Sequence, residues 1–422
     1  MFASALARNT AWMSVGQGLQ FTLQAAYFAV IARTLGVQNY GAFVGVAALV
    51  AVLYPFGSFG RGNLLIKHVA RDRTTFASMW GSALLATIIS SSALVAIIIS
   101  VARFVLPATV PLRLVIFVAI SDIPGLCVIA ISGQAFQAFE HLHWTAFINL
   151  CTSVCRLAAA LLLVLVHRHP SALEWGYAYF ISTAFTVTAA LAIVTWRLGT
   201  PQLRMTSSVS EWREGLYFSV SLSAQTIYNN IDKAMLARFS TLAATGTYGA
   251  AYRLIDVGFS PVSALLYSAY PTFFRSGASG LASSLSYARR LMWRAMHYGI
   301  VVTVLLFAGA SVVPMVLGPQ YKDTAEALRW LAILPILKVV HYPLSDALSG
   351  AGYQGIRSVI QTAVAIFNVS VNLWIIPRYS WRGAAWSSIA SDTLLAAAIA
   401  LCSIMVSRHE RMRFNALASD AT

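Results

Sequence analysis

The feature that most constrains this chain is a series of long apolar stretches that follow one another from end to end. A membrane-spanning helix needs about 20 mostly apolar residues. With ends uncertain by several residues, twelve such stretches are present: roughly 10–32, 41–66, 78–101, 113–135, 144–166, 175–196, 215–238, 247–273, 294–317, 327–350, 356–376 and 383–406. Short linkers join them, so the sequence predicts an all-α polytopic membrane protein.

Composition excludes several other classes of protein. Hydrophobic residues make up 58% of the 422 and charged residues only 10%, against about 25% charged in soluble proteins. A soluble globular fold, a coiled coil and a disordered chain are therefore excluded. The net charge of +15 is spread along the whole chain and forms no basic patch of the kind that binds nucleic acid.

The loops and cysteines argue against several kinds of enzyme and against a metal site. No loop is long enough for the soluble domain that a glycosyltransferase, a kinase or an ATP-driven pump needs, and no P-loop is present. The four cysteines lie inside apolar stretches without partners at metal-ligand spacing. We expect no metal site and no cofactor.

Basic residues in the loops predict the orientation. If both termini are cytoplasmic, fourteen Lys and Arg residues fall in inside segments and seven in outside segments. Since cytoplasmic loops carry the excess of Lys and Arg, both termini are expected in the cytoplasm.

The chain divides into two predicted halves. We expect an N-terminal six-helix lobe at 1–200, a cytoplasmic loop at 201–214, a C-terminal six-helix lobe at 215–406 and a cytoplasmic tail at 407–422. The pairs Tyr40-Gly41 and Tyr248-Gly249 follow the first and seventh spans. Parallel repeats about an axis along the membrane normal are typical of transporters, although a dipeptide can also recur by chance.

Charges at membrane depth point to function or to internal pairing. Eight basic residues and five acids lie within or at the edges of the spans: Arg61, Arg156, Lys233, Arg238, Arg253, Arg294, Arg329, Lys338, and Asp122, Asp232, Asp256, Asp346, Asp392. Each costs about 2.5–3.5 kcal/mol at a helix centre, and those near helix ends are interfacial anchors. The others either pair to fix helix packing or line a hydrated cavity, whose basic excess suits an anionic substrate.

Three local patterns single out candidate residues. Arg61 lies among three glycines, which let the backbone loosen, and loose backbone is tolerated only against protein or water. Asp232 and Lys233 lie in a polar part of the seventh span. Arg253 and Asp256 are three apart, so they can pair on one helix face.

Uncharged polar residues mark two further helix faces. Gln24 shares a face of the first span with Gln17 and Gln20, and Asn372 shares one with Asn368 in the eleventh. These amides either face a hydrated cavity or form hydrogen bonds between helices.

Four stretches resemble the polysaccharide transporter branch of the multidrug/oligosaccharidyl-lipid/polysaccharide exporter superfamily, which includes the O-antigen flippases. They are 32–41 with 57–60, 231–239 with 246–253, 317–321, and 368–379 with 383–385. One departure is that Ser380 and Trp381 stand where the family usually has Gly and a small or polar residue. This puts the shape of that loop in doubt.

The resemblance implies a two-lobed, V-shaped bundle with a central cavity and alternating access. It implies that an oligosaccharide on a polyprenyl pyrophosphate is flipped to the outer leaflet of the bacterial inner membrane, for O-antigen, capsule or exopolysaccharide synthesis. A polysaccharide polymerase, export machinery and membrane lipids are the implied partners. Asp232, Lys233 and Arg253 stand in matching motifs, so the family's cavity-lining role is carried over to them.

The predicted substrate-binding residues are Arg61, Lys233, Arg253, Gln24 and Asn372. The three cations are hypothesised to hold the pyrophosphate, because Arg makes bidentate phosphate contacts and Lys supplies a point charge.

The predicted ion-coupling candidates are Asp232 and Asp256, with H⁺ or Na⁺ as the coupling ion. Two alternatives to a flippase stay open. A cation-coupled multidrug exporter would prefer an acidic cavity, whereas this interior leans basic. A membrane polysaccharide polymerase or ligase should show a large outer loop, and the sequence has none.

Overall fold

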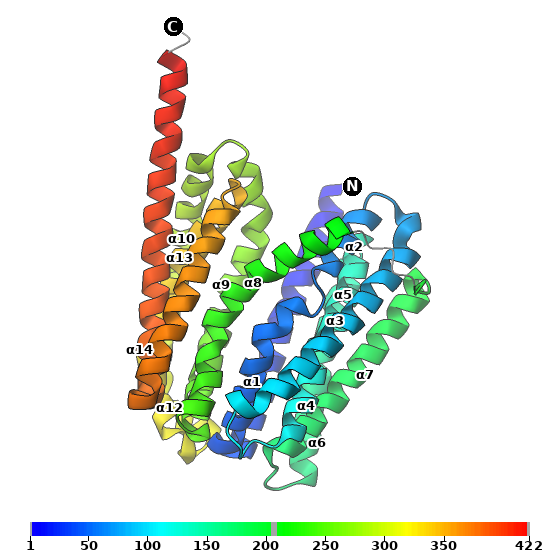
Figure 1. Ribbon diagram of the computed structural model, residues 1–422, viewed down its shortest axis with the longest axis vertical. Coiled ribbons are helices and arrows are strands. Elements are labelled where there is room, and N and C mark those ends of the chain that lie inside the picture. Colours follow the sequence, from blue (N-terminus) through cyan, green and yellow to red (C-terminus); the bar gives the residue numbers. More distant parts are fainter. Residues whose placement is uncertain (1, 204–208, 420–422) are drawn as a thin grey trace. The chain divides into compact units, whose positions relative to one another are not determined.

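The computed structural model describes residues 2–203 and 209–419, which are helical almost throughout and contain no strand (Figure 1). Parts of the predicted loop 201–214 and tail 407–422 lie outside these ranges. The α-helices are α1 (Phe2–Leu53), α2 (Arg61–Val69), α3 (Phe76–Val105), α4 (Leu112–Ile120), α5 (Leu126–Ala138), α6 (Leu142–Val166), α7 (Ala172–Leu198), α8 (Val209–Phe239), α9 (Leu242–Gly277), α10 (Leu281–Gly309), α11 (Val313–Leu317), α12 (Lys322–Leu331), α13 (Leu334–Gly350) and α14 (Gln354–Ser419). Short turns of tighter or wider helix are η1 (Tyr54–Phe56), η2 (Arg73–Thr75), η3 (Ser121–Gly125), η4 (Ala310–Val312) and η5 (Pro319–Tyr321).

The predicted spans fall on these helices. In the described residues, 7 helical segments are long and apolar enough to cross a membrane, and 8 if the bent pair Pro319–Leu331 and Leu334–Gly350 forms one span. Two of them, Gly18–Val69 and Gln354–Glu410, are interrupted and long enough for two crossings each. The more polar helices α8 and α9, with 31 and 36 residues, cover the seventh and eighth predicted spans. The predicted all-α, polytopic fold class is confirmed.

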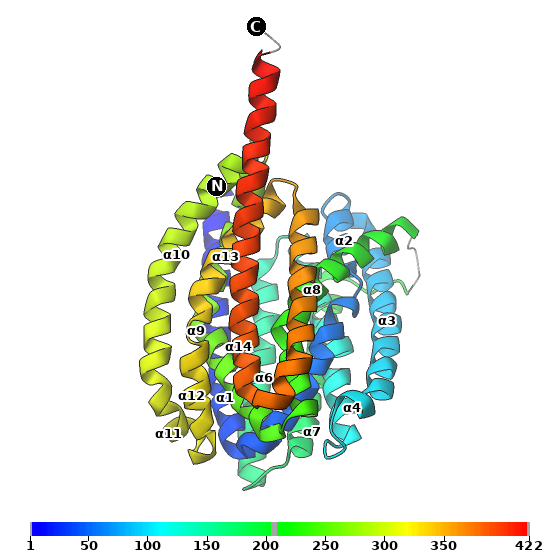
Figure 2. The same cartoon turned by 60° about the vertical axis from the view of Figure 1, so that its left-hand side comes forward.

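Single residues interrupt the two longest helices. In α1, Gly36 has φ 71° and ψ 167°, which glycine adopts without a steric penalty. In α14, Ser380 has φ 54° and ψ −136°, a conformation that costs a residue with a side chain about 1–3 kcal/mol. Figure 2 shows the two arms of α14 side by side, running in opposite directions on either side of this break. The serine therefore occupies a backbone position that favours the glycine usual in the resembling family.

We predict that Ser380→Gly raises the free energy of unfolding by about 1 kcal/mol, because glycine relieves the strain at the break. The measurement is the thermal unfolding midpoint of the purified protein in detergent. Ser370→Gly is the control, since Ser370 is an exposed residue with helical geometry in the same helix. There glycine is expected to lower stability slightly. An unchanged or lower midpoint for Ser380→Gly would contradict the strain.

The first compact unit consists of Met1–Gly249 and Val316–Tyr321. Helices α2, α3, α5, α6 and α7 enclose a core around Trp80 and Phe136, which are both fully buried. The distant segment joins this unit through α1. The Tyr321 hydroxyl donates to the carbonyl oxygen of Ala32 at 2.8 Å, and an Arg33 guanidinium nitrogen donates to the carbonyl oxygen of Val316 at 3.0 Å.

Within this unit, α1 and the start of α9 pass unusually close to each other. We call this contact the α1–α9 crossing and define it by four glycines: Gly41 and Gly45 of α1, and Gly246 and Gly249 of α9. A Cβ atom on Gly41 would lie 1.7 Å from the carbonyl oxygen of Leu242, and one on Gly246 would lie 2.0 Å from that of Val37. Small residues of this kind let membrane helices approach backbone to backbone. The crossing contains both Tyr-Gly pairs that suggested a repeat.

The second compact unit consists of Ala250–Met315 and Lys322–Thr422. Its core lies among α9, α10 and α13, with Phe273 and Val339 fully buried at its centre. The division between the units falls inside α9, after Gly249. The compact units therefore differ from the predicted lobes 1–200 and 215–406, whose boundaries stay a prediction.

Candidate functional site

A compensated pair of charges is buried in α8. The Lys233 ammonium lies 3.2 Å from Oδ1 of Asp232, and both side chains are buried. The Tyr248 hydroxyl donates to Oδ2 of Asp232 at 2.5 Å. The Lys233 ammonium also donates to the carbonyl oxygen of Asn229 and lies 5.7 Å from the centre of the Tyr248 ring. Asp232 thus receives two hydrogen bonds from charged or polar side chains inside the first unit.

The polar run of α8 continues one turn before this pair. Asn229 and Asn230 are half-buried, and the Asn230 amide donates to the carbonyl oxygen of Thr226 at 3.0 Å. The helix that carries Asp232 therefore presents amide groups as well as charges, as its sequence predicts.

Arg61 begins α2 directly after an irregular stretch of backbone. Phe59 and Gly60 have φ angles of 44° and 65°, so the chain leaves helical geometry between η1 and α2. The Ser90 hydroxyl donates to the carbonyl oxygen of Gly57 at 2.6 Å, which satisfies one acceptor in that stretch. Arg61 itself is buried, and α2 packs against α8. The loosened backbone expected at the three glycines is present, and it is covered by protein.

Gln24 lies half-buried on α1, in the first unit. Of the two residues that share its face, Gln20 is also half-buried, while the side chain of Gln17 lies outside those that the structure describes. The substrate-binding role of Gln24 stays a prediction.

The second unit contributes a different charge pair from the predicted one. Arg253 of α9 is half-buried, and the Asp256 side chain is 52% exposed. The ion pair of Asp256 is with Lys338 of α13, whose ammonium lies 3.9 Å from Oδ1. Lys338 is buried, 5.8 Å from the ring centre of Tyr252. Lys338 was missing from the predicted site, although a lysine within a span was a visible signal for it.

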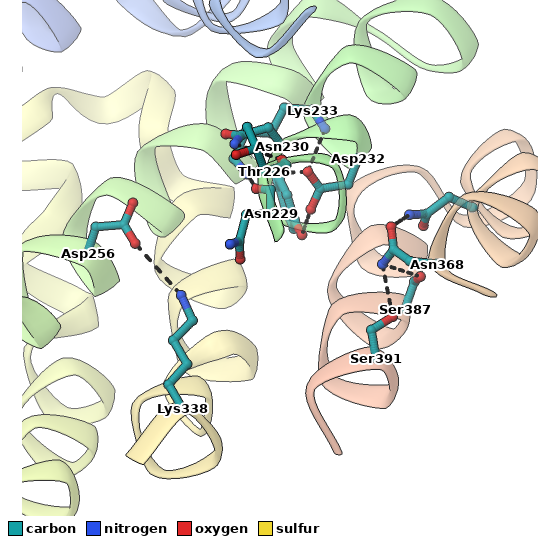
Figure 3. Close-up of polar contacts among 12 residues, drawn as sticks. Thr226, Asn229, Asn230, Asp232, Lys233, Asp256, Lys338, Asn368, Ser387 and Ser391 are labelled. Carbon is teal, nitrogen blue, oxygen red and sulfur yellow. Dashed lines mark hydrogen bonds and ion pairs between the residues drawn. The ribbon is translucent and has the colours of Figure 1, made fainter. Parts of the chain in front are cut away.

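Asn372 belongs to a network that joins the two arms of α14. Its amide donates to Oδ1 of Asn368 at 2.9 Å, and Asn368 donates to the hydroxyls of Ser391 at 2.9 Å and Ser387 at 3.3 Å (Figure 3). Both asparagines are fully buried. This geometry favours hydrogen bonding between helices over contact with substrate, and the substrate-binding role of Asn372 stays a prediction.

A cluster of three residues in the first unit was not predicted as a site. Arg156 of α6 lies 3.8 Å from Asp122 of η3, and its guanidinium carbon lies 3.7 Å from the ring centre of Tyr179. The Tyr179 hydroxyl donates to Asp122 at 2.6 Å, and Arg156 donates to the hydroxyl of Thr183 at 3.3 Å. We call Arg156, Asp122 and Tyr179 the Arg156 cluster. Its members come from three separate helical segments, so no sequence spacing could reveal it.

No group of three or more His, Cys, Asp or Glu side chains is arranged to hold a metal ion in the part of the chain that the structure describes.

The chain matches a known protein family and is similar in sequence to a named transporter. Residues 6–276 match the family described as “Polysaccharide biosynthesis protein”. A protein of Escherichia coli (strain K12) named “Putative O-antigen transporter” is 22% identical over 347 residues, which cover 79% of this chain and 80% of that protein.

Two solved structures share the fold. An inward-facing multidrug resistance MATE family transporter of the MOP superfamily has a TM-score of 0.75 at 15% identity, covering 95% of this chain and 96% of that one. The lipid II flippase MurJ, in an inward closed conformation, has a TM-score of 0.73 at 11% identity, covering 92% and 87%.

The helices and their buried charges define a multi-pass membrane protein with the fold of these two structures. The chain belongs to the polysaccharide biosynthesis protein family. The predicted resemblance to the polysaccharide transporter branch is therefore confirmed.

Proposed function

We propose that this protein flips polyprenyl-pyrophosphate-linked oligosaccharides from the cytoplasmic to the outer leaflet of the bacterial inner membrane, with both termini in the cytoplasm. The observation that carries this proposal is a set of basic side chains within the helices of a polysaccharide biosynthesis family member: Arg61, Lys233 and Lys338 are buried, and Arg253 is half-buried. The relative named for O-antigen transport supports the same substrate class. A polysaccharide polymerase that uses the flipped units is the proposed partner.

The difficulty in flipping is the head group. A pyrophosphate and several sugars must cross about 30 Å of hydrocarbon. Cations and hydrogen-bonding groups in a hydrated cavity replace the water around the head group while the lipid tail stays in the bilayer. Arg61 and Arg253 are suited to bidentate phosphate contacts, and Lys233 supplies a point charge.

The membrane potential assists the loaded step. Moving negative charge outward across a membrane whose inside is negative releases about 2.3 kcal/mol per charge at 100 mV, so two charges give roughly 4.6 kcal/mol. In an alternating-access cycle, a coupling ion is then needed mainly to return the empty carrier.

We predict that Arg253→Ala lowers polysaccharide output about tenfold or more, because a hydrogen bond to a charged group contributes about 1.5–3 kcal/mol and 1.4 kcal/mol is tenfold. Arg253→Lys keeps the charge and is expected to retain part of the output. The assay measures surface polysaccharide in a flippase-deficient strain, with membrane levels of each variant matched.

Arg290→Ala is the control, since Arg290 is an exposed residue of α10, and its output is expected to equal that of the wild type. Wild-type output from Arg253→Ala would remove the phosphate role. Drug resistance without rescue of the flippase-deficient strain would favour a multidrug exporter instead.

A further inference from the structure

A histidine and an aspartate meet inside the second unit. Nε2 of His341 in α13 lies 3.2 Å from Oδ1 of Asp392 in the second arm of α14. Their side chains are only 1% and 4% exposed. Among the described residues, neither ring nitrogen of His341 nor Oδ1 of Asp392 has a hydrogen bond of good geometry. In the described part of the chain, the ion pair of Asp392 is with His341, and His341 also has an electrostatic interaction with Asp346.

The helices around this pair bring mostly apolar groups. α10 turns Ala295 and Gly299 inward, while its titratable residues near this level, Arg294, His297 and Tyr298, are exposed. From α9, Phe259 packs against Tyr342, whose ring centre is 4.7 Å from that of His341. A charge on the pair is therefore poorly solvated.

The nearby charged groups are already engaged with one another. On α13, Asp346 lies 3.0 Å from Arg357 of α14, and Lys338 lies 3.9 Å from Asp256 of α9. On α12, Glu326 is paired with Arg382 of α14 at 3.1 Å. Because the charged groups of these three pairs compensate one another, His341 is the group placed to neutralise Asp392.

The chemistry of the pair depends on one proton. A neutral imidazole beside the carboxylate leaves a single buried negative charge, whereas an added proton gives an imidazolium and a carboxylate with no net charge. Leaving a buried charge without its partner costs several kcal/mol. The pair therefore favours binding a proton while it stays buried, and it favours releasing the proton when water reaches it.

We propose that His341 and Asp392 together bind the proton that is exchanged during the transport cycle, an inference that rests on the proposed flippase function. Asp232 and Asp256, the coupling carboxylates predicted from the sequence, each lie beside a lysine ammonium that compensates their charge without a proton.

The helix next to His341 has a built-in point of bending. Pro343 lies inside α13, two residues after the histidine. Proline has no N–H, so the carbonyl of Val339 lacks its helical hydrogen bond and the helix can bend there. Bending at this point opens the packing of α13 on α14, which admits water to the pair and links proton exchange to helix movement.

The direct test is the nitrogen NMR spectrum of ¹⁵N-histidine-labelled protein in lipid nanodiscs between pH 5 and 9. The His341 signal is the one lost in His341→Gln. We expect the spectra to contain both the imidazolium and the neutral imidazole form of His341. In Asp392→Asn, the ratio of imidazolium to imidazole at a given pH is expected to fall about tenfold or more, because an opposite charge within about 4–6 Å favours the charged form.

The functional test uses the polysaccharide assay at matched membrane levels. His341→Gln and Asp392→Asn are each expected to lower output at least tenfold, and Asp392→Glu to restore part of it. His297→Gln is the matched control on α10, since His297 is exposed, and it is expected to keep full output. The double variant of His341→Gln and Asp392→Asn leaves no lone buried charge, so it is expected to fold normally and still to transport poorly.

The outcomes separate the two proposals. A His341 signal that stays neutral, or stays charged, from pH 5 to 9 overturns the proton site whatever the transport result. Full output from the folded double variant also overturns it. If the signal titrates as expected but the wild type rescues no flippase-deficient strain, the flippase function fails and the proton site stands.

Discussion

Replacing Arg156 with alanine is expected to lower the free energy of unfolding by about 3–5 kcal/mol, because breaking a buried ion pair leaves its partner uncompensated. The carboxylate of Asp122 would keep only the hydroxyl of Tyr179, in a position where its side chain is 13% exposed. The measurement is the unfolding midpoint of the purified protein in detergent, together with the fraction that elutes as a single species.

Two comparisons isolate the charge effect in the Arg156 cluster. A double variant of Arg156→Met and Asp122→Leu removes both charges and is expected to recover most of the lost stability, since apolar replacements of buried ion pairs are often neutral. Arg113→Ala changes an exposed arginine of α4 and is expected to stay within about 0.5 kcal/mol of the wild type. An Arg156→Ala protein as stable as the Arg113→Ala control would show that the pair contributes nothing.

Gly41→Leu is expected to cost about 3 kcal/mol or more, because overpacking that meets backbone cannot be relieved by moving a side chain. Even a Cβ atom at this position would lie 1.7 Å from the carbonyl oxygen of Leu242 and 2.7 Å from the backbone nitrogen of Gly246. Helices α1 and α9 would have to separate. Detergent extracts should contain little monodisperse protein, which size-exclusion chromatography of a fluorescent fusion measures.

Gly18→Leu is the matched control for this prediction. Gly18 lies in the same helix, and a Cβ atom there would meet no atom within 4 Å. It is expected to give a wild-type elution profile. If Gly41→Leu gave the same elution profile, the claim that α1 and α9 lie too close for a side chain at this position would be contradicted.

The helices could be predicted because the signal for a span is local. Apolar length identifies a membrane helix without knowledge of its neighbours, and the predicted spans fall on helices. The seventh and eighth spans, which fall on the more polar helices α8 and α9, were predicted from apolar length as well. The π-helical turn at η3, which carries Asp122, was not predicted, because the bend at Pro124 depends on packing as well as on proline.

The site could be predicted only where its residues are neighbours in sequence. Asp232 and Lys233 are adjacent, and they do form an ion pair. The sequence also allowed Arg253 and Asp256 to pair, but the observed partner of Asp256 is Lys338 from another helix. Partners on different helices depend on how each helix is rotated and shifted, and one sequence contains no record of that. The Tyr248 hydroxyl on Asp232 was missed for the same reason.

The α1–α9 crossing has a consequence for how such a chain can arise. Its glycines stand beside Tyr40 and Tyr248, the residues that mark equivalent places in the two predicted halves. In a chain made of two copies of one six-helix unit, this contact lies between the same segment of each copy. A two-fold symmetric dimer is held together in the same way, by one surface patch that is complementary to its own copy. In such a chain, the glycine surface is the contact that a second copy would otherwise have to provide, and a single polypeptide keeps it at any protein concentration.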